Sequence, residues 1–151
     1  MVYGIVHSIL LGGFSGTIIQ KLRDNEGLIY WANLGRNTFK QDVRYMMFST
    51  GCDKSKKDLV VEKIKRVLED TITDLKQEDI DRTIPIKIYN QKVPPNAYED
   101  LSELMDSIIY ETDYIQTEEY LKLLKSAKAF EVKNFMKKYF VEENSSTVFL
   151  D

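Results

Sequence analysis

The sequence predicts an α+β fold in which several helices cover one face of a small, mostly antiparallel sheet. Apolar residues recur at helical spacing in several separate segments, whereas two neighbouring segments nearer the N-terminus are rich in aromatic and β-branched residues. The chain has 151 residues, of which 43% are hydrophobic. This length and composition suit one globular domain with a sizeable core.

Two short helices are expected before the first strand. Apolar residues at helical spacing predict a helix over residues 2–11, which the glycine pair at 12–13 then breaks. Helical spacing resumes over residues 14–23. This second helix should end near Gly27, because glycine readily takes the left-handed conformation that follows a helix C-terminus.

The sheet is expected to consist of residues 28–34 and 43–50, joined by the polar stretch 35–42, which turns the chain between them. Residues 146–150 are a candidate for a further short strand. Three strands make a thin sheet for so many apolar helices. The chain is therefore expected to be part of a larger structural unit.

A long amphipathic helix follows the second strand, with Asp53 or Ser55 as its N-cap. Its apolar stripe comprises Val60, Ile64, Val67, Leu68, Thr71 and Leu75. The next segment, residues 77–92, fits two interpretations. Its isoleucines alternate at positions 84, 86 and 88 as in a strand, and recur at 80, 84 and 88 as in a helix kinked at Pro85.

The C-terminal third is expected to be helical. Two prolines at 94 and 95 break the chain, and Asn96 with Glu99 resembles a capping pair before an apolar series at 101, 104, 105 and 108. Thr117 is expected to cap a short helix that runs to Leu124. A last helix carries Val132, Phe135, Met136, Tyr139 and Phe140 at helical spacing.

Composition excludes several classes of function. The 21 basic and 24 acidic residues are interspersed and give a net charge of −3, so no basic footprint for nucleic acid is present. The longest apolar run is far shorter than the roughly 20 residues that a membrane span needs. One cysteine, Cys52, and one histidine, His7, cannot by themselves build a zinc site of three or four ligands. We interpret Cys52 as a buried, inert thiol and His7 as a packing or partly exposed histidine.

The glycines at positions 12, 13 and 16 raise the question of a phosphate-binding loop. A P-loop needs G-x-x-x-x-G-K-[ST] after a strand, and a dinucleotide fold needs G-x-G-x-x-G between a strand and a helix. The chain has neither pattern. A tight turn between two helices, whose small residues allow close packing, is the better interpretation.

The segment "LGGFSGTIIQKLRDNEGLIYWANLG" resembles the C-terminal, non-zinc-binding domain of the M16 zinc metallopeptidases, the group of insulinase, pitrilysin and the mitochondrial processing peptidase. The spacing from Arg23 to Tyr30 is that of the family's Arg/Tyr pair. The resemblance continues in order through "FSTGCDKSKKDLVVEKIKRVL", "KQEDIDRTIPIKIYNQ" and "AKAFEVKNFMKKYFVEENSSTVFLD". It thus covers nearly the whole chain, residues 1–151, as a single domain that is a fragment or half of a larger peptidase.

The resemblance implies an α+β half-unit in which residues 77–92 form a helix bent at Pro85. Members usually have one more strand before the first helix, so the chain is expected to lack its first strand. The family's catalytic zinc is held by an H-x-x-E-H motif. The chain does not contain this motif, and so no cofactor is expected in it. Zinc is expected in the partner, a zinc-bearing M16 N-terminal domain or subunit that faces this domain across a substrate chamber.

Arg23 and Tyr30 would then be the contribution of this chain to the reaction. A tyrosine hydroxyl can donate a hydrogen bond to the oxyanion that develops on the scissile carbonyl, so Tyr30 is the candidate catalytic residue. The Arg23 guanidinium has five donors and is the candidate substrate-binding group, holding backbone carbonyls of an extended peptide. The structural alternative is that Arg23 is a solvated charge at a helix end and Tyr30 packs on the core.

The expected function is therefore the substrate-side half of an M16-type zinc endopeptidase, inactive by itself. The alternative is a catalytically inactive scaffold or interaction domain of the same fold. The absence of a signal sequence and of disulfide-forming cysteines favours a cytoplasmic location.

Overall fold

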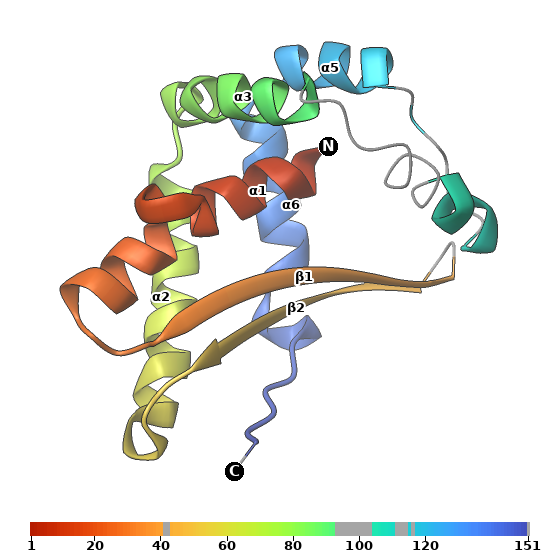
Figure 1. The fold of residues 1–151 in the computed structure, drawn as a ribbon. Helices are drawn as coiled ribbons and strands as arrows, with labels where there is room; N and C mark the ends of the chain where they lie inside the picture. Colours follow the sequence, from red (N-terminus) through yellow and green to blue (C-terminus); the bar gives the residue numbers. More distant parts are fainter. Residues whose placement is uncertain (41–42, 93–103, 111–114, 116, 151) are drawn as a thin grey trace.

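The computed structural model describes residues 1–40, 43–92, 104–110, 115 and 117–150, and in these ranges it confirms the α+β prediction (Figure 1). The chain begins with helix α1 (Val2–Leu11), a short 3₁₀ turn η1 (Gly13–Ser15) and a π-helical segment η2 (Ile19–Asn25). Strands β1 (Trp31–Lys40) and β2 (Val43–Gly51) follow. A turn η3 (Lys54–Lys56) leads into the helices α2 (Lys57–Asp74), α3 (Gln77–Lys92), α5 (Thr117–Ser126) and α6 (Ala129–Tyr139), and a last turn is η4 (Glu142–Asn144).

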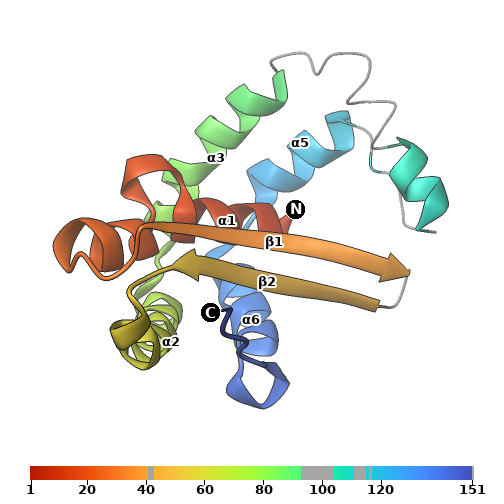
Figure 2. The ribbon, with the colours of Figure 1, turned by 60° about the horizontal axis from the view of Figure 1, so that its bottom comes forward.

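The two strands form an antiparallel ribbon that lies against one side of the helical layer (Figures 1 and 2). Trp31 pairs with Gly51, and Leu34 pairs with Phe48. Because side chains alternate across a strand, Ala32 and Leu34 of β1 and Met46 and Phe48 of β2 share one face, and this face packs on the core. The opposite face carries the exposed side chains of Trp31, Tyr45 and Met47.

Helix α1 occupies the centre of the core, where it contacts α3, α6 and β1. Ile5, Val6 and Leu10 are fully buried on it, as their helical spacing predicts. The other buried apolar side chains come from every layer: Ile18, Ile19, Leu22, Leu28, Ile29, Leu34, Val60, Val67, Leu75, Ile80, Leu124, Ala127, Val132 and Met136. One continuous core therefore joins the ribbon to the helices.

The turn between α1 and η2 is the tight connection that the sequence predicts. A Cβ atom on Gly16 would lie 2.6 Å from the Cα atom of Leu11, so only glycine fits there. The hydroxyl of Thr17 donates to the carbonyl of Ile9 at 3.1 Å and ties the two segments together. The second helix differs from the prediction over 14–23, since its continuous helical part starts later and reaches Asn25.

The ribbon is longer than predicted, and its first strand starts later. Residues 28 and 29 are buried, but they belong to the link into β1 and do not pair in the ladder. The apolar run predicts that these two side chains are buried. They are buried by packing in the core and not by pairing in the sheet. Most of the polar stretch 35–42, predicted to be a turn, pairs as strand up to Lys40. The hydrogen bonds between strands are made by backbone groups, so the outward side chains of a strand can be polar.

The prediction of a strand at residues 146–150 is wrong. This segment has no regular secondary structure, and in the described part of the chain the sheet contains β1 and β2 only. Its residues follow the side of α2 instead, and the ammonium of Lys57 lies 4.6 Å from the centre of the Phe149 ring. A segment with strand-like composition becomes a strand only when it hydrogen-bonds to a strand edge, and residues 146–150 are not part of the described sheet.

The middle of the chain forms the helices α2 and α3. The predicted stripe of α2 is confirmed, with Val60, Val67 and Thr71 buried on it. Residues 77–92 form a helix that contains Pro85, so the helical interpretation is confirmed and the strand is wrong. The isoleucine at 80 is fully buried, whereas Ile86, which the strand pattern requires, is 63% exposed.

The expected N-cap of α2 is wrong. Neither Asp53 nor Ser55 makes a capping hydrogen bond, and the residue at the cap position is Lys56. The side chain of Asp53 is bound elsewhere, by Tyr30.

The C-terminal helices agree with their predicted apolar spacing. Leu124 on α5 is fully buried, as are Val132 and Met136 on α6. Residues 104–109 are helical as expected. The proposed capping pair of Asn96 and Glu99 lies outside the described residues.

Candidate functional site

The candidate site is built on the turn that leads from η2 into β1. Leu22 on η2 is fully buried and anchors this turn to the core. Its carbonyl accepts a hydrogen bond from the Leu28 N–H at 2.8 Å, and the carbonyl of Arg23 accepts one from the Gly27 N–H at 3.1 Å. Gly27 has a φ of +58°, which confirms its predicted left-handed conformation. The chain reverses there, and Arg23 and Tyr30 lie on opposite sides of the reversal.

Arg23 is at the surface, in the last turn of η2. Its Nε donates to Oδ1 of Asp24 at 2.8 Å, and its side chain remains 36% exposed. An ion pair this open to water contributes about 0–1 kcal/mol to stability. The prediction of a solvated charge at a helix end therefore describes Arg23 in the isolated chain, and in the described part of the chain only its Nε makes a hydrogen bond, out of five donors.

Tyr30 lies immediately before β1, and it is not a core residue. Its side chain is 63% exposed, so the alternative of a core-packed tyrosine is wrong. Its backbone N–H donates to the carbonyl of Gly51 at 2.8 Å, at the end of β2. Its hydroxyl donates to Oδ1 of Asp53 at 2.7 Å. This hydrogen bond and then the negative charge of Asp53 raise the pKa of Tyr30 above its ordinary value, with smaller contributions from desolvation and from Cys52.

The structure does not join the two predicted residues directly. In the described ranges the Arg23 side chain is hydrogen-bonded to Asp24 and the Tyr30 side chain to Asp53. No contact there links the side chains of Arg23 and Tyr30. Asp53 is a residue of this turn that the sequence does not point to, because its place before the long helix predicts a helix cap. The signal that points to it is the strand register: Trp31 pairs with Gly51, so Tyr30 comes close to residues just beyond Gly51.

The remaining polar candidates lie away from this turn. His7 is partly buried on α1, beside the ring of Tyr3 at 6.2 Å between centroids. Burial lowers its pKa, and the charge of Lys87 lowers it further. Cys52 is half-buried against the core. It is therefore more exposed than the buried thiol that the sequence predicts.

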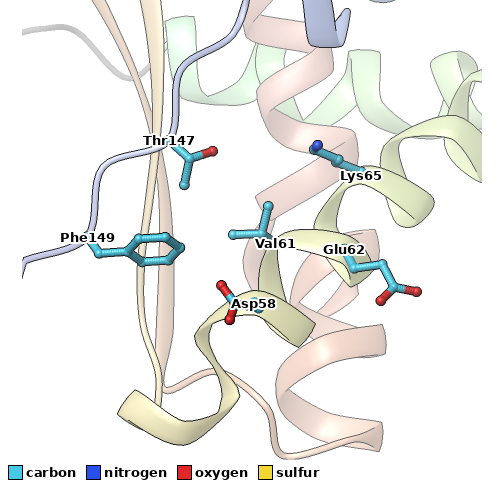
Figure 3. Close-up of a pocket in the computed structure, with 6 residues that line it drawn as sticks. All are labelled: Asp58, Val61, Glu62, Lys65, Thr147 and Phe149. Atoms are coloured by element: carbon cyan, nitrogen blue, oxygen red, sulfur yellow. The ribbon is translucent and has the colours of Figure 1, made fainter.

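A shallow groove of about 380 Å³ lies between α2 and the C-terminal segment (Figure 3). Its walls are formed by Asp58, Val61, Glu62, Lys65, Thr147 and Phe149, of which the last two approach α2 from the C-terminal segment. Neither Arg23 nor Tyr30 lines it. The candidate site is thus a surface turn and not this groove.

Potential metal ligands are scattered over the described part of the chain. Over the ranges that the structure describes, no three His, Cys, Asp or Glu side chains are grouped so as to hold a metal ion. The only histidine of the chain is His7. No step through a metal is therefore assigned to residues of this chain. Over the same ranges, no helix has both the length and the apolar character needed to cross a membrane.

Comparison with known proteins identifies the domain. Residues 2–85 match the family model of the peptidase M16 inactive domain. The chain belongs to this family. The match takes in α1, the Arg23–Tyr30 turn, the ribbon and α2, and it confirms the resemblance to the non-zinc-binding M16 domain. No curated protein matches the chain.

Two solved structures share the fold of this M16 domain. A conserved protein from Enterococcus faecalis V583 superposes with a TM-score of 0.74 at 19% identity, over 91% of this chain and 32% of its own. A peptidase M16 inactive domain from Pseudomonas fluorescens superposes with a TM-score of 0.75 at 16% identity, over 91% of this chain and 33% of its own. The chain therefore spans about a third of the length of either structure.

Proposed function

We propose that this M16 domain is the substrate-side half of a zinc endopeptidase that cleaves extended peptides. The zinc, its ligands and the general base come from a zinc-bearing M16 domain, on the same polypeptide or on a partner subunit. The observation that carries this proposal is the match of residues 2–85 to the inactive domain of a peptidase family. The domain alone, residues 1–151, is inactive. The cytoplasm is the compartment proposed for the assembly.

Arg23 is proposed to hold the peptide. Its guanidinium has five donors, and only Nε is used by Asp24. The remaining donors can bind backbone carbonyls and keep the peptide extended. Because the Arg23–Asp24 pair is solvent-exposed and weak, its rearrangement costs little free energy.

Tyr30 is proposed to stabilise the transition state. Its hydroxyl is protonated at neutral pH, as in any tyrosine whose pKa is not lowered, and a protonated hydroxyl can donate to an oxyanion. Its exposure leaves the ring open to a facing domain. The Tyr30 N–H bond to Gly51 fixes the backbone beneath the ring.

The test is Tyr30→Phe in the assembly of this chain with its zinc-bearing partner. Loss of one oxyanion donor typically lowers kcat by about 10²-fold or more, and we expect at least a roughly tenfold loss of turnover. Tyr45→Phe is the matched control, since Tyr45 is a similarly exposed tyrosine on β2. Equal turnover in both variants would reject the proposed role of Tyr30.

The second candidate is a catalytically silent scaffold of the same fold. It is favoured by one feature of the site, namely that both candidate side chains already have acidic partners, Asp24 and Asp53. A scaffold would bind the zinc-bearing partner with unchanged affinity after replacement of Arg23 and Tyr30, and peptide hydrolysis by the assembly would be insensitive to both changes.

A further inference from the structure

The Tyr30 hydroxyl has one proton, and in this structure that proton is in a hydrogen bond to Asp53. A tyrosine hydroxyl donates one hydrogen bond and otherwise only accepts. Tyr30 donates to Oδ1 of Asp53 at 2.7 Å, and an ionised carboxylate is an acceptor only. While this bond exists, Tyr30 cannot donate to a peptide carbonyl or to an oxyanion.

The contact is set by the backbone on both sides. Tyr30 is attached to β2 by its N–H bond to Gly51, two residues before Asp53. The carbonyl of Asp53 accepts the N–H of Lys56 at 2.9 Å, which closes the turn η3. The ammonium of Lys56 lies 3.7 Å from Oδ2 of Asp53. The carboxylate is thus held with one oxygen toward the lysine and the other toward the phenol.

We propose that Asp53 is a positioning residue that restrains the site: it holds the Tyr30 proton in the free domain, and this hydrogen bond breaks before Tyr30 serves a substrate. The inference rests on the function proposed for Tyr30. It adds Asp53 to the site, and it assigns to Asp53 an inhibitory effect on the reaction.

The direction of the effect follows from the strength of the acceptors. A carboxylate is a stronger acceptor than a neutral peptide carbonyl, so Asp53 retains the proton when a substrate first binds. The transition state then gains the Tyr30–oxyanion bond only at the expense of the Tyr30–Asp53 bond. The net stabilisation of the transition state is therefore the strength of the Tyr30–oxyanion hydrogen bond minus that of the Tyr30–Asp53 hydrogen bond. Removing the carboxylate should therefore raise turnover, and because the contact is exposed we expect a rise of about two- to tenfold.

The hydrogen bond is tested first by titration of Tyr30 in the full chain, without any partner. The tyrosines are labelled with ¹³C at Cζ, and the signal of Tyr30 is the one missing in Tyr30→Phe. Asp53→Asn removes the negative charge while keeping the shape of the side chain, so the Tyr30 pKa should fall and the other tyrosine signals should keep theirs. Asp58→Asn, at an exposed carboxylate in the first turn of α2, is the matched control and should leave Tyr30 unchanged.

The restraint is tested by rates in the assembly with the zinc-bearing partner. Asp53→Asn and Asp53→Ala are each measured with Tyr30 and in the Tyr30→Phe background. The expected result is a higher kcat only where Tyr30 is present, with Asp53→Ala exceeding Asp53→Asn because the amide oxygen still accepts a hydrogen bond.

Two results would overturn the restraint: an unchanged Tyr30 pKa in Asp53→Asn, or a rate that falls or changes equally in both backgrounds. Failure of the proposed function is seen in a different measurement, because it is an unchanged rate in Tyr30→Phe alone.

Discussion

Replacing Leu22 by alanine tests whether the turn that carries the candidate site is anchored in the core. Leu22 is fully buried on η2, its carbonyl is bonded to Leu28, and Arg23 is the next residue. Leucine-to-alanine changes at fully buried positions destabilise a protein by about 2.7–5 kcal/mol, through lost burial and the cavity that remains. We expect a loss in the upper half of that range, about 4 kcal/mol, because the backbone around Leu22 is fixed by the turn and cannot collapse into the cavity.

Urea unfolding followed by far-ultraviolet circular dichroism measures this loss. With a slope of about 2 kcal/mol per molar urea, a loss of 4 kcal/mol moves the midpoint down by roughly 2 M. Gln20→Ala is the matched control, because Gln20 is exposed on the same segment and should change the free energy of unfolding by less than about 0.5 kcal/mol. A loss below about 1 kcal/mol in Leu22→Ala would refute the argument, since it would mean that η2 is not sealed against the core.

Two further predictions concern stability. Gly27→Ala should lower the free energy of unfolding by about 1–2 kcal/mol, because the φ of +58° is costly for any residue with a Cβ atom. Gly35→Ala is its control in thermal unfolding and should be close to neutral, since its Cβ would meet only ordinary contacts at 3.9 Å. For His7, whose pKa is lowered by burial and then by Lys87, the unfolded state takes up a proton before the folded state does. Its contribution to stability is therefore complete above the unfolded pKa of about 6.5 and decreases as the pH falls below it, and His7→Gln should flatten the unfolding free energy between about pH 7 and 5.

The strand register explains why the candidate site was only partly predictable. Arg23, Gly27 and Tyr30 follow one another closely along the chain, and the resemblance to the M16 domain makes Arg23 and Tyr30 candidates. Asp53 is 23 residues beyond Tyr30, and its local sequence is that of a helix cap. Only the pairing of Trp31 with Gly51 brings it to the phenol.

Local periodicity determined the helical part of the fold from sequence alone. The stripes of α1 and α2 repeat every three or four residues over enough turns that only a helix buries them on one side. Gly27 was also predictable, because a left-handed residue after a helix is a local requirement met mainly by glycine. The order of these segments was sufficient to recognise the M16 inactive domain.

The tertiary structure decided whatever depended on a distant partner. Residues 77–92 carry isoleucines that fit both periods, and it is the burial of Ile80, on a segment that packs against α1, α5 and α6, that selects the helix. Residues 146–150 have the composition of a strand, but hydrogen bonding to a neighbouring edge makes a strand, and their described neighbour is the side of α2. Composition and period state what a segment is able to form, whereas the free energy gained from partners far along the chain decides what it does form.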